Sequence, residues 1–107
     1  MKFEKLLEPG QIGKLQTTNR IIKTCGGAED IGKINNSFLE ALARGGAGLI
    51  IWGDVAVEYP RGVTIPITGR HLEDDTYIPV FAKMAEASHR HGCPIFMQLF
   101  QIGRAHV

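Results

Sequence analysis

Three strand-like apolar segments alternate with two helical segments along this chain. The β-branched residues Ile21-Ile22, leading to Lys23-Thr24, predict a short strand. Leu49–Trp52 and Pro94–Phe100 are apolar at nearly every position, which is typical of strands buried on both faces of a parallel sheet. Ahead of them, Ile12–Arg20 predicts a hairpin with Gly13 in its turn.

The segment Ile34–Arg44 has the periodicity of a helix. Its apolar positions share one face, and these are Phe38, Leu39, Leu42 and Ala43. One of the polar residues at 35–37 supplies the N-terminal cap, and Glu40 follows Ser37 at the spacing of a capping box. Gly45 is the predicted left-handed residue that ends this helix.

A second helix is predicted to begin at Asp74 or Asp75, with Pro79 in its first turn, where a missing N–H costs nothing. Gly92 ends it. Its apolar stripe is expected to hold Ile78, Phe81, Ala82, Ala85 and His89. The Pro- and Gly-containing segment Val55–Arg70, between the second strand and this helix, predicts a long loop of the kind that often serves function.

The β-α-β-α-β order predicts right-handed crossovers and a parallel sheet, so the fold class is α/β. We expect one domain over residues 1–107, made of an N-terminal hairpin, three parallel strands and two helices. No helix follows the third strand before Val107, so one edge and one face of the sheet are expected to be bare. This pattern is typical of the start of a larger fold.

Charge and composition exclude several classes of function. Twelve Lys and Arg balance eleven Asp and Glu for a net charge of +1, which argues against nucleic-acid binding and against a polybasic membrane surface. The first eight residues are too charged for a signal peptide, and no apolar run is long enough to cross a bilayer. Cys25 and Cys93 are too few for a disulfide scaffold, so we expect a cytoplasmic protein.

His89, His91 and Cys93 form a cluster of residue types that ligate zinc. Three closely spaced ligands seldom close a structural site, so we expect no metal here. His89 is instead expected on the apolar stripe of its helix, His91 on the exposed last turn, and Cys93 in the interior before the third strand.

Three segments in register resemble the N-terminal part of the old yellow enzyme family of NADH:flavin oxidoreductases and ene-reductases. They are Ile12-Gly13-Lys14-Leu15 with Asn19-Arg20-Ile21-Ile22-Lys23, then Ala43–Ile51, then Ile95–Arg104. The resemblance runs from about Leu6 to Val107.

This resemblance implies a (β/α)8 barrel that binds FMN. A complete barrel needs about 250 residues, so the chain would be a partial barrel. Family members reduce the flavin with NAD(P)H and pass hydride from flavin N5 to an alkene conjugated to a carbonyl, so a small enone- or enoate-type substrate is implied. The flavin performs the electron chemistry, while protein groups bind it and polarise the substrate.

Gln98 matches the family glutamine that hydrogen-bonds the pyrimidine edge of the flavin. It lies near the C-terminal end of the third strand, where the active sites of barrel enzymes lie. Its amide both donates and accepts, as that edge requires. The alternative is an amide satisfied by backbone or water.

Cys25, Gly26 and Gly27 align with the family turn that contacts the flavin after the first strand. The two glycines leave backbone N–H groups free to approach the flavin but remove the side-chain hydrogen bond that usually tunes it. Cys25 does not occupy the place where some relatives carry a regulatory thiol, since Gly27 does, and an inert loop cysteine is the favoured interpretation.

Asp54 falls where many relatives place Gly or Ala against the ring, and a carboxylate there would oppose an anionic reduced flavin. Either Asp54 or the preceding Gly53 is at the contact. Gln101 stands where many members have histidine or another residue, a further departure, and Arg104 is expected to form a structural ion pair.

The family residues that grip the substrate, supply the proton and bind the FMN phosphate match nothing in this chain, so no catalytic residue is assigned. We therefore expect the isolated chain to be inactive and to retain FMN poorly. It is a truncated gene product, a half-barrel that self-associates, or one part of a split enzyme that needs a C-terminal half. The substrate, the choice of NADH or NADPH, and a further iron–sulfur domain are not specified by these residues.

Overall fold

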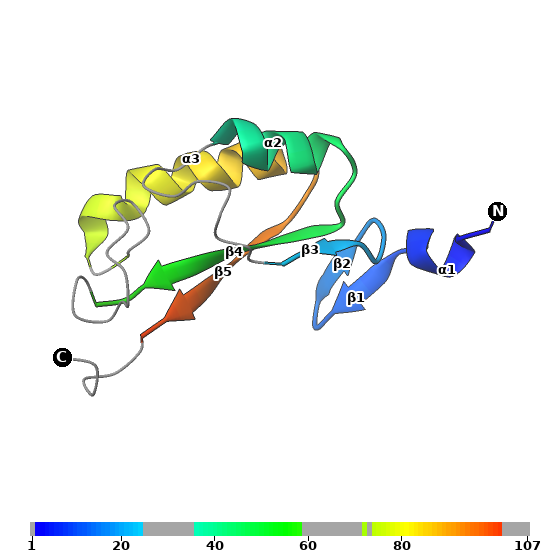
Figure 1. Cartoon of the computed structure of the whole chain (residues 1–107), viewed down its shortest axis with the longest axis horizontal. Helices are drawn as coiled ribbons and strands as arrows, with labels where there is room; N and C mark the ends of the chain where they lie inside the picture. Colours follow the sequence, from blue (N-terminus) through cyan, green and yellow to red (C-terminus); the bar gives the residue numbers. More distant parts are fainter. Residues whose placement is uncertain (1, 25–35, 59–71, 73, 102–107) are drawn as a thin grey trace.

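A computed structural model describes residues 2–24, 36–58, 72 and 74–101 (Figure 1). This part holds two small sheets, two longer helices, one short helix and one 3-10 helix. The elements in chain order are α1 (Glu4–Leu7), β1 (Gly10–Ile12), β2 (Leu15–Thr17), β3 (Ile22–Lys23), α2 (Asn36–Arg44), β4 (Leu49–Ala56), the 3-10 helix η2 (Asp75–Tyr77), α3 (Ile78–His89) and β5 (Ile95–Phe100). None of the helices described is long and apolar enough to span a bilayer.

The predicted hairpin is confirmed. β1 and β2 pair antiparallel from Gly10 opposite Thr17 to Ile12 opposite Leu15, with Gly13 in the turn at φ 58°. The hairpin starts at Gly10, two residues earlier than predicted. The short helix α1, which the sequence pattern did not indicate, precedes it and buries no residue.

The predicted parallel sheet is also confirmed. Its three strands run in the order β3-β4-β5, and both neighbouring pairs are parallel. β3 begins opposite the start of β4, where Ile22 pairs with Leu49. β4 is longer than predicted, because Val55 and Ala56 belong to the strand and not to the loop. Both are almost fully buried, at 0% and 1% exposure, which explains why they stay in the sheet.

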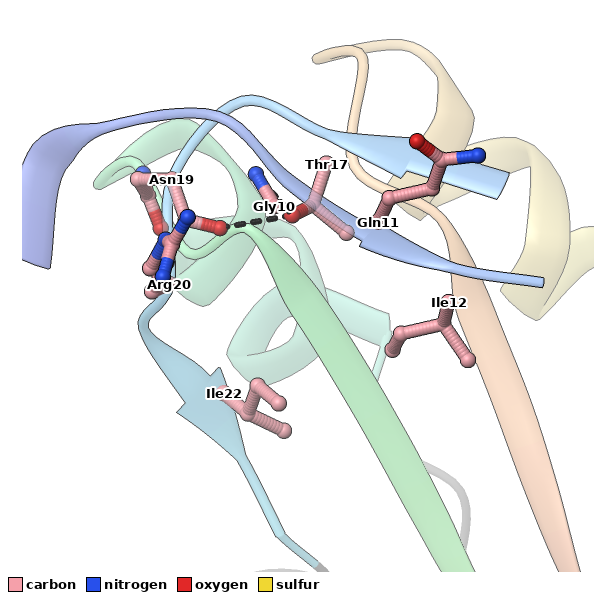
Figure 2. Close-up of a pocket in the computed structure, with 7 residues that line it drawn as sticks. All are labelled: Gly10, Gln11, Ile12, Thr17, Asn19, Arg20 and Ile22. Atoms are coloured by element: carbon pink, nitrogen blue, oxygen red, sulfur yellow. Dashed lines mark hydrogen bonds between the residues drawn. The ribbon is translucent and has the colours of Figure 1, made fainter. Parts of the chain in front are cut away.

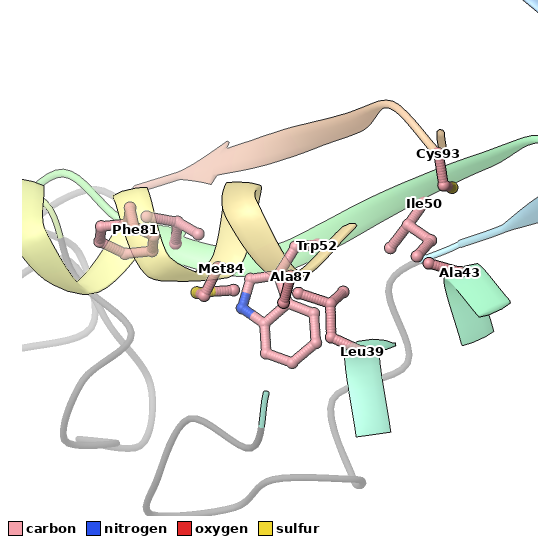
Figure 3. Packing of buried hydrophobic residues seen from close by; sticks show 9 residues of the cluster. Leu39, Ala43, Ile50, Trp52, Phe81, Met84, Ala87 and Cys93 are labelled. Atoms are coloured by element: carbon pink, nitrogen blue, oxygen red, sulfur yellow. The ribbon is translucent and has the colours of Figure 1, made fainter. Parts of the chain in front are cut away.

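Helices α2 and α3 lie on the same side of this sheet (Figure 1). The core lies between the helices and the sheet, and Figure 3 shows Trp52 of β4 meeting Leu39 of α2 and Met84 of α3. The buried members of the cluster are Leu39, Ala43, Ile50, Trp52, Val55, Phe81, Met84, Ala87 and Cys93. Trp52 is therefore a packing residue.

The stripe predicted for α3 is wrong in part. Phe81 is buried as expected, but Ile78 is 54% exposed, and Ala82 and His89 are exposed too. The buried face instead adds Met84, Ala87 and Ser88. Ala85 is half-buried, and Met84 and Ala87 both pack in the cluster that contains Trp52. Asp74 caps η2 by accepting from the N–H of Thr76 at 2.8 Å.

The predicted end of α2 is off by one residue. The positive φ of 106° falls at Gly46, not Gly45, and the Ala47 N–H reaches back to the Leu42 carbonyl at 3.3 Å. The predicted capping box between Ser37 and Glu40 is also wrong, because α2 begins at Asn36 and Ser37 therefore lies inside its first turn.

The prediction that β5 is buried on both faces is wrong. Phe96, Met97 and Leu99 are 40%, 40% and 59% exposed. Within the described residues β5 has only β4 beside it, and both helices lie on one side of the sheet. The bare edge and bare face expected from the sequence are thus present in the part of the chain that the structure describes.

Candidate functional site

The C-terminal ends of β4 and β5 contain a β-bulge. Trp52 pairs with Met97, and the next pair along is Val55 with Leu99. Two residues of β4, Gly53 and Asp54, therefore lie opposite one residue of β5, Gln98. Bulges of this kind are common beside active sites, because they re-aim a strand where it leaves the sheet.

The bulge follows from which side chains of β4 are buried. Trp52 and Val55 are both in the core, at 3% and 0% exposure, although strict alternation would place residues 52 and 55 on opposite faces. An unbulged strand would put position 54 on the helix-covered face with Trp52. Burying a carboxylate without a partner on that face would be costly. The extra residue of the bulge places Val55 on that face instead.

Gln98 lies on the face of the sheet that the helices do not cover. Its neighbour Met97 lines a small cavity of about 130 Å³ beneath α3, and adjacent side chains of a strand point to opposite faces. The side chain of Gln98 is exposed. Its amide presents both a donor and an acceptor on this face, which suits a flat heteroaromatic edge with the same mixture of groups.

The structure thus brings together three of the residues singled out from the sequence. Gln98 and the two alternatives Gly53 and Asp54 are neighbours across β4 and β5, and Gly53 is buried. The sequence left Gly53 and Asp54 as alternatives for one position. Both can occupy it, because the bulge sets both of them opposite Gln98.

The remaining candidates, Cys25, Gly26, Gly27 and Arg104, fall outside the described residues. Strand β3, which precedes residues 25–27 in the chain, is described and ends at Lys23, opposite Ile50. Because β3 runs parallel to β4, its C-terminal end points toward the same edge of the sheet as Gln98.

Two further contacts occur where β4 and β5 leave the sheet. The Gln101 side-chain amide donates to a Glu58 carboxylate oxygen at 3.2 Å, and the Leu72 N–H donates to the Ala56 carbonyl at 2.7 Å. Sequence reasoning missed Glu58 entirely. Its signal was available, because residues that follow neighbouring parallel strands share one edge of the sheet.

The three residues of zinc-ligating type, His89, His91 and Cys93, have different surroundings. His91 is half-buried and not exposed as predicted, because its Nε2 lies 3.0 Å from Oε1 of Glu40 on α2. Cys93 is 2% exposed, as predicted. His89 is exposed on α3. Among the described residues, no group of three or more His, Cys, Asp or Glu side chains is placed to hold a metal ion.

A cavity of about 420 Å³ lies between the hairpin and β3, away from Gln98 (Figure 2). Figure 2 shows Ile12 and Ile22 on its walls and the Thr17 hydroxyl, which donates to the Asn19 carbonyl at 2.7 Å. This cavity is lined by the hairpin and β3 and not by the C-terminal ends of β4 and β5, so the Gln98 region remains the better candidate for chemistry.

Comparison with curated proteins finds oxidoreductases. The chain is 39% identical to an NADH oxidase of Thermoanaerobacter brockii over 95% of its own length and 16% of that protein. It is 38% identical to a metal reductase of Desulforamulus reducens over 92% of its length and 15% of that protein. The chain therefore spans about one-sixth of these relatives. No family model matches it.

Solved structures give a consistent result. The old yellow enzyme from Trypanosoma cruzi superposes with a TM-score of 0.76 and 30% identity, over 98% of this chain and 29% of that one. Morphinone reductase in complex with tetrahydroNAD superposes with a TM-score of 0.74 and 26% identity, over 92% of this chain and 28% of that one.

Proposed function

The chain belongs, over the part that it spans, to the old yellow enzyme family of oxidoreductases, and from that premise we propose that it forms one side of an FMN site in an NAD(P)H-dependent oxidoreductase. The fold is accordingly part of a (β/α)8 barrel. In such barrels the active site lies at the C-terminal ends of the strands, which is where Gln98 and the bulge lie.

The observation that carries the proposal is the position of Gln98 opposite Gly53 and Asp54 on the uncovered face of the sheet. The donor set fits a flavin in one respect: a single exposed amide offers a donor and an acceptor in one plane. The buried Gly53 adds no side chain beside it. Residues Cys25, Gly26 and Gly27 are proposed as a second side of the same site.

A bound FMN would supply hydride transfer between NAD(P)H and a small alkene conjugated to a carbonyl. The part assigned to this chain is binding and orientation. Gln98 would hold the polar edge of the ring, and Gly53 with Asp54 would form the strand end against which the ring lies. No residue of the chain is assigned a proton-transfer role.

The test is a chimera. The chain replaces the matching segment of the Thermoanaerobacter brockii NADH oxidase, and the protein-bound FMN is measured by absorbance after dialysis. We expect about one FMN per chimera, and at least about a tenfold weaker FMN affinity after Gln98→Leu, because a pair of hydrogen bonds is lost. Gln16→Leu, at an exposed position of the hairpin, is the matched control and should retain FMN. Full retention by the Gln98→Leu chimera would contradict the proposal.

For the isolated chain we propose that FMN is not retained and alkenes are not reduced. Only one side of the site is assigned to these residues, and the residues that polarise the substrate and bind the phosphate in the family match none of them. Reconstitution with FMN followed by dialysis should leave a spectrum without flavin bands. A stoichiometric flavin spectrum would overturn this.

A second candidate function is association through the two edge strands of the sheet. Ile22 on β3 and Leu99 on β5 are 44% and 59% exposed, so each edge strand presents apolar surface. The partner is a second copy or a separate chain that supplies the C-terminal half of the barrel. Sedimentation over a hundredfold concentration range distinguishes them, since only self-association raises the mass of the pure chain.

A further inference from the structure

The hydrogen bond between Gln101 and Glu58 lies immediately beyond the bulge. Gln101 follows the last residue of β5, and Glu58 lies two residues past the last residue of β4. The donor–acceptor distance is 3.2 Å between side chains 43 positions apart in the chain. The bond therefore ties the two strands together where they leave the sheet.

The bulge sets which residues of β4 lie beside Gln101. Before it, residues pair with partners 45 positions later, as Trp52 does with Met97; after it, they pair 44 positions later, as Ala56 does with Phe100. Continued by one step, the second register sets residue 57 opposite Gln101, with Glu58 next along. In the first register Ala56 would face Gln101 and Glu58 would lie one residue further away, a distance of about 3.3 Å along the strand.

We infer that the Glu58–Gln101 hydrogen bond is a positioning contact that holds the strand ends in the bulged register, which the burial of Trp52 and Val55 sets, and so stabilises the position of Gln98 opposite Gly53 and Asp54. A shift of one residue in register exchanges the faces of every side chain beyond it, so a contact past the bulge stabilises one register over the other. Glu58 and Gln101 are positioning residues. Their consequence for FMN rests on the proposed function, but the register itself does not.

A second contact, at the last residue of β4, holds the same strand end. The Leu72 N–H bonds to the carbonyl of Ala56, the last residue of β4, and Leu72 packs against the core. The end of β4 is thus held by a backbone hydrogen bond at Ala56 and by the Glu58 side chain two residues beyond it.

The experiment compares backbone NMR of the full chain with that of Gln101→Leu, which removes the amide at similar size. In the unsubstituted chain we expect cross-strand contacts between Val55 and Leu99. In Gln101→Leu we expect protected amides of β5 beyond Gln98 to exchange about threefold to tenfold faster, the effect of one lost hydrogen bond. A second set of signals, with Leu99 beside Asp54, marks the unbulged register.

Two variants keep the inference falsifiable. Glu58→Gln retains a carbonyl oxygen that accepts from Gln101, so its exchange rates should stay within about twofold of the unsubstituted chain. Gln16→Leu makes the same change at an exposed hairpin position and should leave β5 unaffected. Equal exchange in Gln101→Leu and Gln16→Leu, or loss of protection in Glu58→Gln, would overturn the inference.

The flavin measurement separates this inference from the proposed function. If Gln98→Leu chimeras keep their FMN while Gln101→Leu still disturbs the register, the proposed function fails and the positioning contact stands. If Gln98→Leu weakens FMN binding but Gln101→Leu leaves the register unchanged, the proposed function stands and the positioning role of Gln101 is wrong.

Discussion

Asn19 and Gly48 lie so close together that no side chain fits at position 48. A Cβ atom on Gly48 would lie 2.5 Å from Oδ1 of Asn19 and 2.6 Å from its backbone oxygen. Around this contact the Asn19 amide donates to the Gly46 carbonyl at 2.6 Å, and its Oδ1 accepts from the Ile21 N–H at 2.9 Å. One asparagine thus joins the entrance of β3 to the turn that leads into β4.

Gly48→Ala should destabilise the fold by about 1–3 kcal/mol, because the new methyl group meets both the side-chain oxygen and the backbone of Asn19. Urea denaturation followed by circular dichroism measures it. Gly45→Ala is the matched control: its added Cβ comes no closer than 3.2 Å to another atom, so its cost should be clearly smaller. Equal midpoints for the two variants would show that the approach of Asn19 is not limiting.

Asn19→Ala should cost about 1–3 kcal/mol, because the Ile21 N–H and the Gly46 carbonyl both lose their partner. Asn19→Asp keeps an oxygen for Ile21 but places a carboxylate against the Gly46 carbonyl, so it should not restore stability. The same denaturation measurement applies. If both variants are as stable as the unsubstituted chain, Asn19 does not contribute to the stability of the fold.

Glu40→Gln should make stability less dependent on pH in the acid range. The hydrogen bond from His91, with the positive charge of Arg90 nearby, lowers the pKa of Glu40 below its ordinary 4.5, although partial burial opposes this. A carboxyl whose pKa is lower in the folded state stabilises the fold above its unfolded pKa, and this stabilisation is lost as the pH falls through the folded value.

Thermal unfolding from pH 7 to pH 3 checks this. The unsubstituted chain should have the higher Tm at pH 6–7, and the two proteins should converge at the acid end. Glu86→Gln is the control, since Glu86 is 71% exposed and lies 3.9 Å from Arg90. A difference in Tm that persists unchanged at pH 3 would contradict the role given to the Glu40 charge.

Cys93 should be a slow thiol in the folded chain. Burial raises its pKa, and its side chain is 2% exposed, so little thiolate is present and little of it is accessible. In a Cys25→Ser variant, which isolates Cys93, reaction with a thiol reagent at pH 8 should be at least about 100-fold slower than in urea. Similar rates under both conditions would indicate that the core around Ala43 and Ile50 opens readily.

Local patterns in the chain were sufficient for the order and pairing of its main elements. Continuous apolar runs such as Leu49–Trp52 indicate strands covered on both faces, and their alternation with helical periodicity leaves a parallel sheet as the simple solution. The same reasoning overestimated the burial of β5. Periodicity records how apolar a strand is but not whether an element lies on each face of it.

The sequence by itself determined the α/β architecture, the hairpin turn at Gly13, and Gln98 as the amide at a strand end, because each depends on residues close together in the chain. Only the tertiary structure decided the register between β4 and β5, the bulge opposite Gln98, and the pairing of Glu58 with Gln101 and of Glu40 with His91. Those contacts join residues more than 40 positions apart. Their geometry depends on how Trp52 and Val55 share one core, which no local pattern encodes.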